Sequence, residues 1–271
     1  MKYGMVAGSG RFPLLALETA RKLGDDVVAI ALREEAAPEV EQVAAKCYWI
    51  SLGDLSKLID ICKRESITDL IMAGQVKHAT IFSSIRPDWR LLKLLASLKE
   101  KNTDALIGGV ARVLQDEGIH LADSTLFLKP LLAGSGVLSK RKPTDDENKD
   151  IRYGRRIAST LAGMDVGQSV AICQRACVAV EAMEGTDAML RRAATLTNGR
   201  PLTLVKSSNR RKHLLYDVPV VGLTTIETMA ETGATALAVD AGRTLMLDRE
   251  KMLERGNELQ IAIAGLEADE G

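Results

Sequence analysis

The sequence predicts an α/β protein with two domains, an N-terminal Rossmann-like domain with a parallel sheet and a C-terminal domain of mixed α/β structure. Two observations lead to this prediction. Short apolar runs rich in β-branched residues alternate with amphipathic helical patterns along most of the chain. A charged stretch broken by proline, residues 139–150, interrupts the alternation near the middle. We therefore expect domains at residues 1–138 and 151–271, joined by a linker at 139–150.

The composition is that of a globular protein, and it excludes some classes of partner. Of the 271 residues, 46% are hydrophobic and 27% are charged. Basic and acidic residues number 36 each, so the chain has no basic field for nucleic acid, and aromatic residues, at 3%, are too few for base stacking. No apolar run approaches the roughly 20 residues of a membrane helix, and we expect no signal peptide. The four cysteines have no Cys-x-x-Cys spacing, and we interpret them as reduced core residues of a cytoplasmic protein.

The first 32 residues follow the order strand, glycine turn, helix, strand. The strands are expected at 2–7 and 27–32, and the turn is Gly8-Ser9-Gly10-Arg11. The helix begins near Pro13, whose missing N–H costs nothing in a first turn, and ends at Gly24. Because Pro13 replaces the third glycine of the dinucleotide fingerprint, the pattern argues against NAD. It favours a loop that faces a phosphate or a sugar.

A second loop is expected beside this one. Strands are predicted at 47–51 and 69–73, and Gln75, Lys77 and His78 follow the second of them. Carboxyl ends of parallel strands meet at one edge of a sheet, so these residues should face the same crevice as the glycine turn. For Lys77, a phosphate contact and a solvated loop position are equally compatible with the pattern, whereas His78 is interpreted as a surface histidine.

Helices at 89–98 and 103–117 and a strand at 119–122 complete the first half. Asp104 lies in the first turn of the second helix, either as a partner of the helix dipole or facing a ligand, and Asp123 follows the strand. In the second half we expect helices at 151–161, 186–196, 224–231 and 248–257 and strands at 169–173, 176–180, 202–206, 236–239, 244–247 and 261–264.

Three carboxylates gather in the sequence where an apolar run, residues 178–180, gives way to a helix. Glu181, Glu184 and Asp187 surround this corner, and Thr186 is the expected N-cap. The run is interpreted as a buried strand. Acids beside a helix N-terminus either cap the helix or hold a divalent cation that in turn holds a phosphate. Both interpretations stay open for each acid at this point.

Asp217 precedes Val218-Pro219, and a residue before proline is held extended, so the local backbone is stiff. A carboxylate on such a corner, after the basic stretch 210–213, suits a base or a metal ligand acting on a phosphate ester. A turn aspartate paired with a neighbouring arginine explains the same pattern equally well.

Several of these stretches together resemble the LpxI-type UDP-2,3-diacylglucosamine pyrophosphatases of lipid A biosynthesis. The resemblance covers nearly the whole chain and is carried by residues 7–13, 101–106, 165–170, 179–187 and 217–222, which read AGSGRFP, KNTDAL, DVGQSV, AVEAMEGTD and DVPVVG. It implies a cytoplasmic, Mg²⁺-dependent enzyme at the inner face of the inner membrane. The reaction it implies is hydrolysis of UDP-2,3-diacylglucosamine to UMP and 2,3-diacylglucosamine 1-phosphate (lipid X), by a homodimer that binds lipid between its two domains.

The family's essential aspartate falls on Asp217. We expect this residue to be catalytic and to bind metal together with Glu181, Glu184 or Asp187, which would position the metal or the water. We expect substrate contacts from Gly8, Ser9, Gly10, Arg11, Gln75, Lys77, Asp104, Asp123, Gln168, Thr186 and Lys206. Lys77, Lys206 and the helix N-terminus are suited to stabilising charge on the transferring phosphoryl group.

The stretch before Asp217 departs from the family pattern. Where the family reads Lys-Pro-x-Gln-Asp-x-Arg-x-Asp, this chain has Asn209 to Asp217 as NRRKHLLYD, with Lys212-His213 in place of Gln-Asp and Leu215 in place of arginine. The departure bears on activity and not on the fold. It leaves open a nucleotide or sugar-lipid binding protein without activity. The Rossmann-like first half leaves open a second alternative, a nucleotide-sugar-modifying enzyme such as a transferase or reductase.

Overall fold

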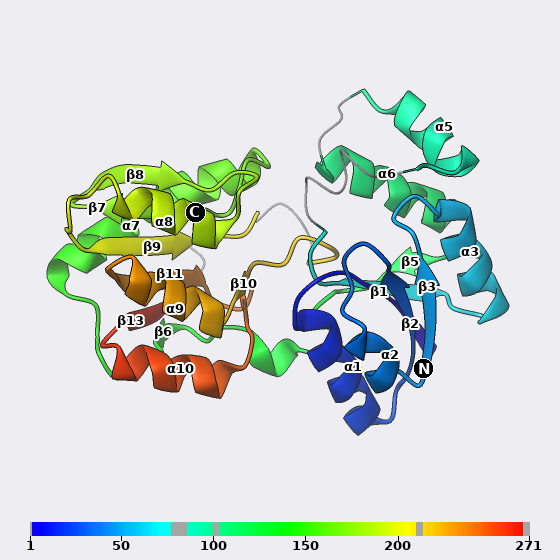
Figure 1. Cartoon of the computed structure of the whole chain (residues 1–271), viewed down its shortest axis with the longest axis horizontal. Coiled ribbons are helices and arrows are strands. Elements are labelled where there is room, and N and C mark those ends of the chain that lie inside the picture. The colour runs from blue at the N-terminus through cyan, green and yellow to red at the C-terminus, as the bar shows by residue number, and fades with distance from the viewer. Residues whose placement is uncertain (1, 77–85, 100–102, 210–213, 268–271) are drawn as a thin grey trace. The chain divides into compact units, whose positions relative to one another are not determined.

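The structure is a computed structural model that describes residues 2–76, 86–99, 103–209 and 214–267 (Figure 1). The chain divides into two compact units. Unit 1 comprises residues 1–128 together with 214–216, and unit 2 comprises 129–213 and 217–271. Each unit combines a sheet with helices, which confirms the predicted α/β class, Rossmann-like in the first half and mixed in the second.

The sheet of unit 1 is parallel throughout, in the order β3-β2-β1-β4-β5. Its strands are β1 (Lys2–Ala7), β2 (Asp26–Leu32), β3 (Lys46–Ile50), β4 (Asp69–Ala73) and β5 (His120–Leu121). The apolar run of β2 is buried from Val27 to Leu32, as expected for a strand covered on both faces. The strand order reverses between β1 and β4, the position where open α/β sheets bind ligands.

The helices of unit 1 lie on both sides of its sheet, with α1 and α2 on one side and α3 on the other (Figure 1). They are α1 (Phe12–Leu23), α2 (Glu39–Val43), α3 (Leu55–Arg64), α5 (Trp89–Ser97) and α6 (Thr103–Asp116). Helix α1 ends as predicted at Gly24, which has a left-handed φ of 77°. The five residues of α2 were not predicted, because they are too few for a periodic pattern to be recognised.

The sheet of unit 2 is mixed, in the order β6-β13-β11-β9-β7-β8. Its strands are β6 (Gly136–Val137), β7 (Ser169–Cys173), β8 (Ala176–Val180), β9 (Leu202–Lys206), β11 (Ala234–Asp240) and β13 (Ala262–Leu266), and the short β10 (Val220–Val221) pairs with β12 (Leu245–Met246). Strands β9, β11 and β13 are parallel, whereas β7 runs antiparallel to both β9 and β8. Strands β8 and β9 therefore end at the same edge of the sheet.

The helices of unit 2 enclose this sheet. Helix α7 (Asp145–Gly163) packs Ile151 and Ala158 against Val170, Ile172 and Val205 on one face. The other face is covered by α8 (Thr186–Ala194), α9 (Leu223–Glu231) and α10 (Arg249–Glu258), and a 3₁₀ turn, η1 (Lys129–Leu131), begins the unit.

Two expectations for unit 2 require correction. The run at residues 178–180 is a strand, as predicted, but it is only partly buried, because β8 lies at the end of the strand order. Residues 139–150 are not a free linker: α7 begins at Asp145, six residues earlier than expected, and the whole stretch belongs to unit 2. Thr144 and Glu147 form a capping box, and acids in a first turn are favourable with the helix dipole.

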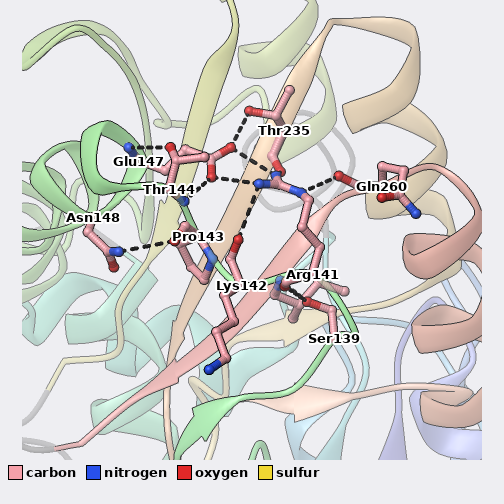
Figure 2. A network of polar contacts seen from close by, with 10 residues as sticks. Ser139, Arg141, Lys142, Pro143, Thr144, Glu147, Asn148, Thr235 and Gln260 are labelled. Atoms are coloured by element: carbon pink, nitrogen blue, oxygen red, sulfur yellow. Dashed lines mark hydrogen bonds and ion pairs between the residues drawn. The ribbon is translucent and has the colours of Figure 1, made fainter.

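A polar network fastens this stretch to the sheet (Figure 2). Arg141 makes two bonds to the Glu147 carboxylate, at 2.8 and 2.9 Å, and also donates to the carbonyl oxygens of Thr235 and Gln260. The Thr235 hydroxyl donates to Glu147 at 2.7 Å. Burial alone would raise the pKa of Glu147, but the bonds from Arg141, Thr235 and Thr144 outweigh it and lower the pKa to about 2.

Candidate functional site

The glycine loop of unit 1 is held by main-chain contacts with the loop that follows β4. The Gly8 amide donates to the Ala73 carbonyl at 2.8 Å, and the Ser9 amide and hydroxyl donate to the Gln75 carbonyl at 2.8 and 2.9 Å. A Cβ on Gly8 would lie 2.5 Å from the Gln75 oxygen, so only glycine fits there. The expectation that Gln75 lies beside the glycine turn is confirmed by these contacts.

The next residues of the loop have more space around them. Gly10 has φ +89°, and a Cβ built on it meets no described atom within 4 Å. Arg11 is exposed and stands at the N-cap of α1. Among the described residues, the Cβ side of Gly10 is therefore open.

The other candidates in unit 1 are placed less closely. Lys77 and His78 lie outside the described residues, and Asp104 belongs to the first turn of α6, where only the backbone is described. Asp123 follows β5, and its Oδ1 accepts bonds from the amide and the hydroxyl of Thr125, both at 2.7 Å. One oxygen of Asp123 therefore stabilises a local turn.

The carboxyl edge of the unit 2 sheet carries a buried lysine–glutamate pair. Glu181 follows β8 and Lys206 ends β9, and the two side chains approach to 3.6 Å between Oε2 and Nζ. Lys206 also donates to the hydroxyls of Ser169 and Thr186 at 3.2 and 2.9 Å, and Thr186 donates to Glu181 at 2.9 Å. Both charged residues are buried: 5% of the surface of Lys206 and 8% of that of Glu181 is exposed. The sequence placed them as separate substrate and metal ligands, whereas here each neutralises the other.

The surroundings of Glu181 favour its charged form. Burial raises the pKa of this carboxyl, but the charge of Lys206 and the hydroxyl bonds from Ser169 and Thr186 outweigh burial and lower it. Thr186 was predicted to be the N-cap of α8. It is instead the first residue of the helix, and Gly185 is the N-cap. Its hydroxyl thereby joins the helix to the charged pair.

Asp217 is bound by the residue that precedes β7. The Gln168 Nε2 donates to the Asp217 Oδ1 at 2.5 Å, and the Gln168 carbonyl accepts the Ser207 amide at 2.8 Å. Gln168 is adjacent to Ser169 of the buried pair's network. The structure therefore connects Asp217, through one amide side chain, to the ends of β7 and β9.

Glu184 and Asp187 are not drawn into this arrangement. Glu184 pairs with Arg192 at 2.5 Å, which is the main cause of its lowered pKa, and also accepts the Ala182 amide at 3.1 Å. Asp187 is half-buried in the first turn of α8, a favourable position for an acid at a helix N-terminus.

The expected metal site can be tested against these contacts. Glu181 is paired with Lys206 and Glu184 with Arg192, so neither presents an uncompensated carboxylate. In the part of the chain that the structure describes, no three His, Cys, Asp or Glu side chains gather to hold a metal ion. The ligand set Asp217, Glu181, Glu184 and Asp187 does not fit a preformed magnesium site. An Asp217 carboxylate acting with substrate phosphates still suits Mg²⁺, which is commonly held by one or two carboxylates.

The sequence reasoning missed a second buried group at this edge. Asp240, at the end of β11, accepts the amide and the hydroxyl of Ser208 at 2.8 and 3.3 Å. Arg243 donates to the Ser208 hydroxyl at 2.7 Å and to the Asn209 carbonyl at 3.0 Å. These residues fix the start of the loop that leads toward Asp217. The available signal was a polar run directly after a predicted strand, where ligand-facing residues of α/β sheets occur.

Comparison with known proteins places the whole chain. The model of the LpxI N-terminal domain matches residues 2–139, and that of the LpxI C-terminal domain matches residues 134–264. A UDP-2,3-diacylglucosamine pyrophosphatase LpxI from Caulobacter vibrioides is 29% identical over 279 aligned positions, covering 99% of each chain. No helix among the described residues combines the length and apolarity required to cross a membrane.

Solved structures are similar only at a low level. A UDP-glucose 4-epimerase from Bifidobacterium longum has a TM-score of 0.30 and 13% identity, covering 54% of this chain and 42% of its own. The biotin carboxylase domain of a thermophilic 2-oxoglutarate carboxylase has a TM-score of 0.28 and 13% identity, covering 64% of this chain and 34% of its own. These values carry no argument about function. The two domain models, which together span residues 2–264, are decisive: the chain belongs to the LpxI family.

Proposed function

We propose that this protein hydrolyses the pyrophosphate bond of UDP-2,3-diacylglucosamine, releasing UMP and 2,3-diacylglucosamine 1-phosphate (lipid X) in lipid A biosynthesis. The observation that carries the proposal is the match of both LpxI domains, together with a full-length relative named as this pyrophosphatase. The fixed carboxylate of Asp217 at the carboxyl edge of a sheet supports it, because attack on a phosphoanhydride needs a group that positions water.

In this proposal Asp217 orients the attacking water and accepts its proton. Gln168 is a positioning residue, because its amide holds one oxygen of the Asp217 carboxylate. Lys206 and Glu181 act indirectly. Their charges neutralise each other, and their contacts hold together the start of β7 and the ends of β8 and β9. We expect the glycine loop and Gln75 to bind the nucleotide or sugar phosphate.

We further propose that activity depends on Mg²⁺, held by Asp217 and the substrate's own phosphates. When bound there, the ion would neutralise charge on the diphosphate. We also propose that the protein is cytoplasmic, acts at the inner face of the inner membrane and has no nucleic acid partner. A homodimer, and a lipid site between the two domains, stay predictions.

The test is release of UMP from detergent-dispersed UDP-2,3-diacylglucosamine, followed by chromatography with and without a chelator. Asp217→Asn is expected to lower turnover about 10²–10⁴-fold, the usual contribution of a positioned acid or base. Asp145→Asn, an exposed acid of α7, is the matched control and should leave turnover unchanged. Full turnover in the Asp217 variant would remove that residue from the mechanism.

The same assay separates the alternatives. Substrate binding without UMP release by the unaltered protein would favour a binding protein, the alternative that the sequence at 212–213 leaves open. Conversion of the sugar with the diphosphate intact would indicate a nucleotide-sugar-modifying enzyme. Hydrolysis in ¹⁸O-labelled water then identifies the attacked phosphorus, because the label enters either UMP or the lipid product.

A further inference from the structure

A groove lined by cations lies where α7 meets the turn between β7 and β8. Its lining residues are Lys149, Arg152, Tyr153, Arg156 and Arg175, around an open cavity of about 520 Å³. Arg175 belongs to the turn between β7 and β8, whereas Gln168 precedes β7. The cationic groove is therefore at the opposite end of β7 from the Asp217 contact.

The charge of this groove is unbalanced, although the chain as a whole has 36 basic and 36 acidic residues. Four of the five lining residues are cations, all of them exposed, and none is an acid. Lys149 pairs with Asp146 at its margin, at 2.9 Å, and Arg156 lies 5.9 Å from the centre of the Tyr153 ring. The four positions on α7 span about 10 Å along the helix, so the cations form a row and not a point.

Arg175 is fixed in this row by a buried acid. Gln174 and Arg175 both have left-handed backbones, with φ of 50° and 62°, at positions where hairpin turns favour Asn or Gly. Asp150, 7% exposed, accepts both of their amides, at 3.2 and 2.6 Å, and so holds the turn against α7. Because Asp150 occupies both amides, the turn offers no oriented backbone donors to grip a single phosphate.

We propose that the cationic groove docks the protein onto an anionic lipid bilayer. The inference rests on the proposed function, since an enzyme with a diacylated substrate must meet that substrate at a membrane. Exposed cations in a row suit a surface with many negative charges better than one bound anion, which is typically held by oriented donors. Tyr153, which packs partly against the core of unit 2, contributes an amphipathic ring to the lining of the groove, of the kind enriched at membrane interfaces.

The test is sedimentation of the full-length protein with vesicles. It should bind vesicles of phosphatidylglycerol and phosphatidylethanolamine, bind weakly to phosphatidylcholine vesicles, and lose binding as salt rises. Each cation near such a surface contributes about five-fold in partitioning, so Arg152→Ala/Arg156→Ala should bind about 25-fold more weakly. Arg21→Ala/Lys22→Ala, which removes two exposed charges from α1, is the matched control and should bind as the unaltered protein does.

Turnover distinguishes this inference from the proposed function. The groove variant should release UMP normally from detergent-dispersed substrate and more slowly from substrate embedded in anionic vesicles. Equal vesicle binding by the groove and control variants, or no binding by the unaltered protein, would overturn the docking site. Groove-dependent binding of a labelled oligonucleotide in place of vesicles would do the same. Absence of UMP release in detergent would instead contradict the proposed function.

Discussion

The carboxyl edges of the two sheets are held together by different kinds of contact. In unit 1, main-chain bonds join Ser9 to Gln75, and Gly8 allows the two loops to touch. In unit 2, buried side chains do this work, with Lys206 and Glu181 at the centre. We expect a division of roles: the backbone loop of unit 1 contacts the ligand, whereas side chains of unit 2 hold the acid that acts on it, Asp217, through the amide of Gln168.

The largest expected effect comes from breaking the charged pair. Lys206→Met leaves the buried Glu181 carboxylate without its cation, which should lower the free energy of unfolding by about 3–5 kcal/mol at neutral pH. Chemical denaturation with circular dichroism measures this. The double variant Lys206→Met/Glu181→Met should recover most of the loss, and failure to recover would contradict a paired role.

The pH dependence of Lys206→Met sharpens this test. In the unaltered protein the Glu181 pKa is lowered, so its contribution to stability is present above the ordinary value of 4.5 and is lost as pH falls through the folded pKa. Without Lys206, burial raises the pKa, and stability is lost as pH rises through the raised value. The difference in the free energy of unfolding between the unaltered protein and Lys206→Met should therefore become smaller as pH falls.

Glu147→Gln tests whether charge networks elsewhere in unit 2 matter for stability alone. Loss of the bonds from Arg141 and Thr235 should cost about 2–3 kcal/mol in the free energy of unfolding, with turnover per folded molecule unchanged. The folded pKa of about 2 lies below the ordinary value of 4.5. The difference should be complete above pH 4.5 and disappear as pH falls toward 2. A loss of turnover without unfolding would contradict the division of roles.

Gln168→Ala should show the reverse pattern. Without the amide that holds Asp217, kcat is expected to fall about 10–100-fold, since small displacements of a reacting group have effects of that size. The melting temperature and KM should change little. Gln168→Asn, with an amide on a shorter stem, should recover less than the full rate; a normal rate in Gln168→Ala would show that Asp217 is held by other contacts.

The smallest expected difference separates two glycines of unit 1. Gly8→Ala brings a Cβ against the Gln75 carbonyl and should destabilise by about 1–3 kcal/mol or more, with weaker nucleotide binding. Gly10→Ala meets no described atom within 4 Å, and only its φ of +89° opposes the change, at about 1–2 kcal/mol. Thermal unfolding and UMP binding by calorimetry measure both. Equal losses of stability in the two variants would contradict the view that the close approach of Gly8 to the Gln75 carbonyl determines the conformation of the glycine loop.

The sequence predicted local structure well where one pattern dominated. Strand β2 is an uninterrupted apolar run, and the turn after α1 needs glycine, so both were predicted from the local sequence pattern. Helix α7 begins earlier than predicted because the Thr144–Glu147 capping box starts it directly after Pro143, within a charged run that was interpreted as a linker. A capping box is a local signal, and it was available in the sequence.

Pairing between side chains could not be derived in the same way. Glu181 and Lys206 are 25 positions apart, and no periodicity relates Gln168 to Asp217. Antiparallel β7, placed between β8 and β9, brings the first pair to one edge and buries it. The sequence alone determined most of the longer elements, the glycine turn and the family resemblance, because these depend on neighbouring residues. Only the tertiary structure decided which charges neutralise each other and which acid is held by an amide, because strand order sets those distances.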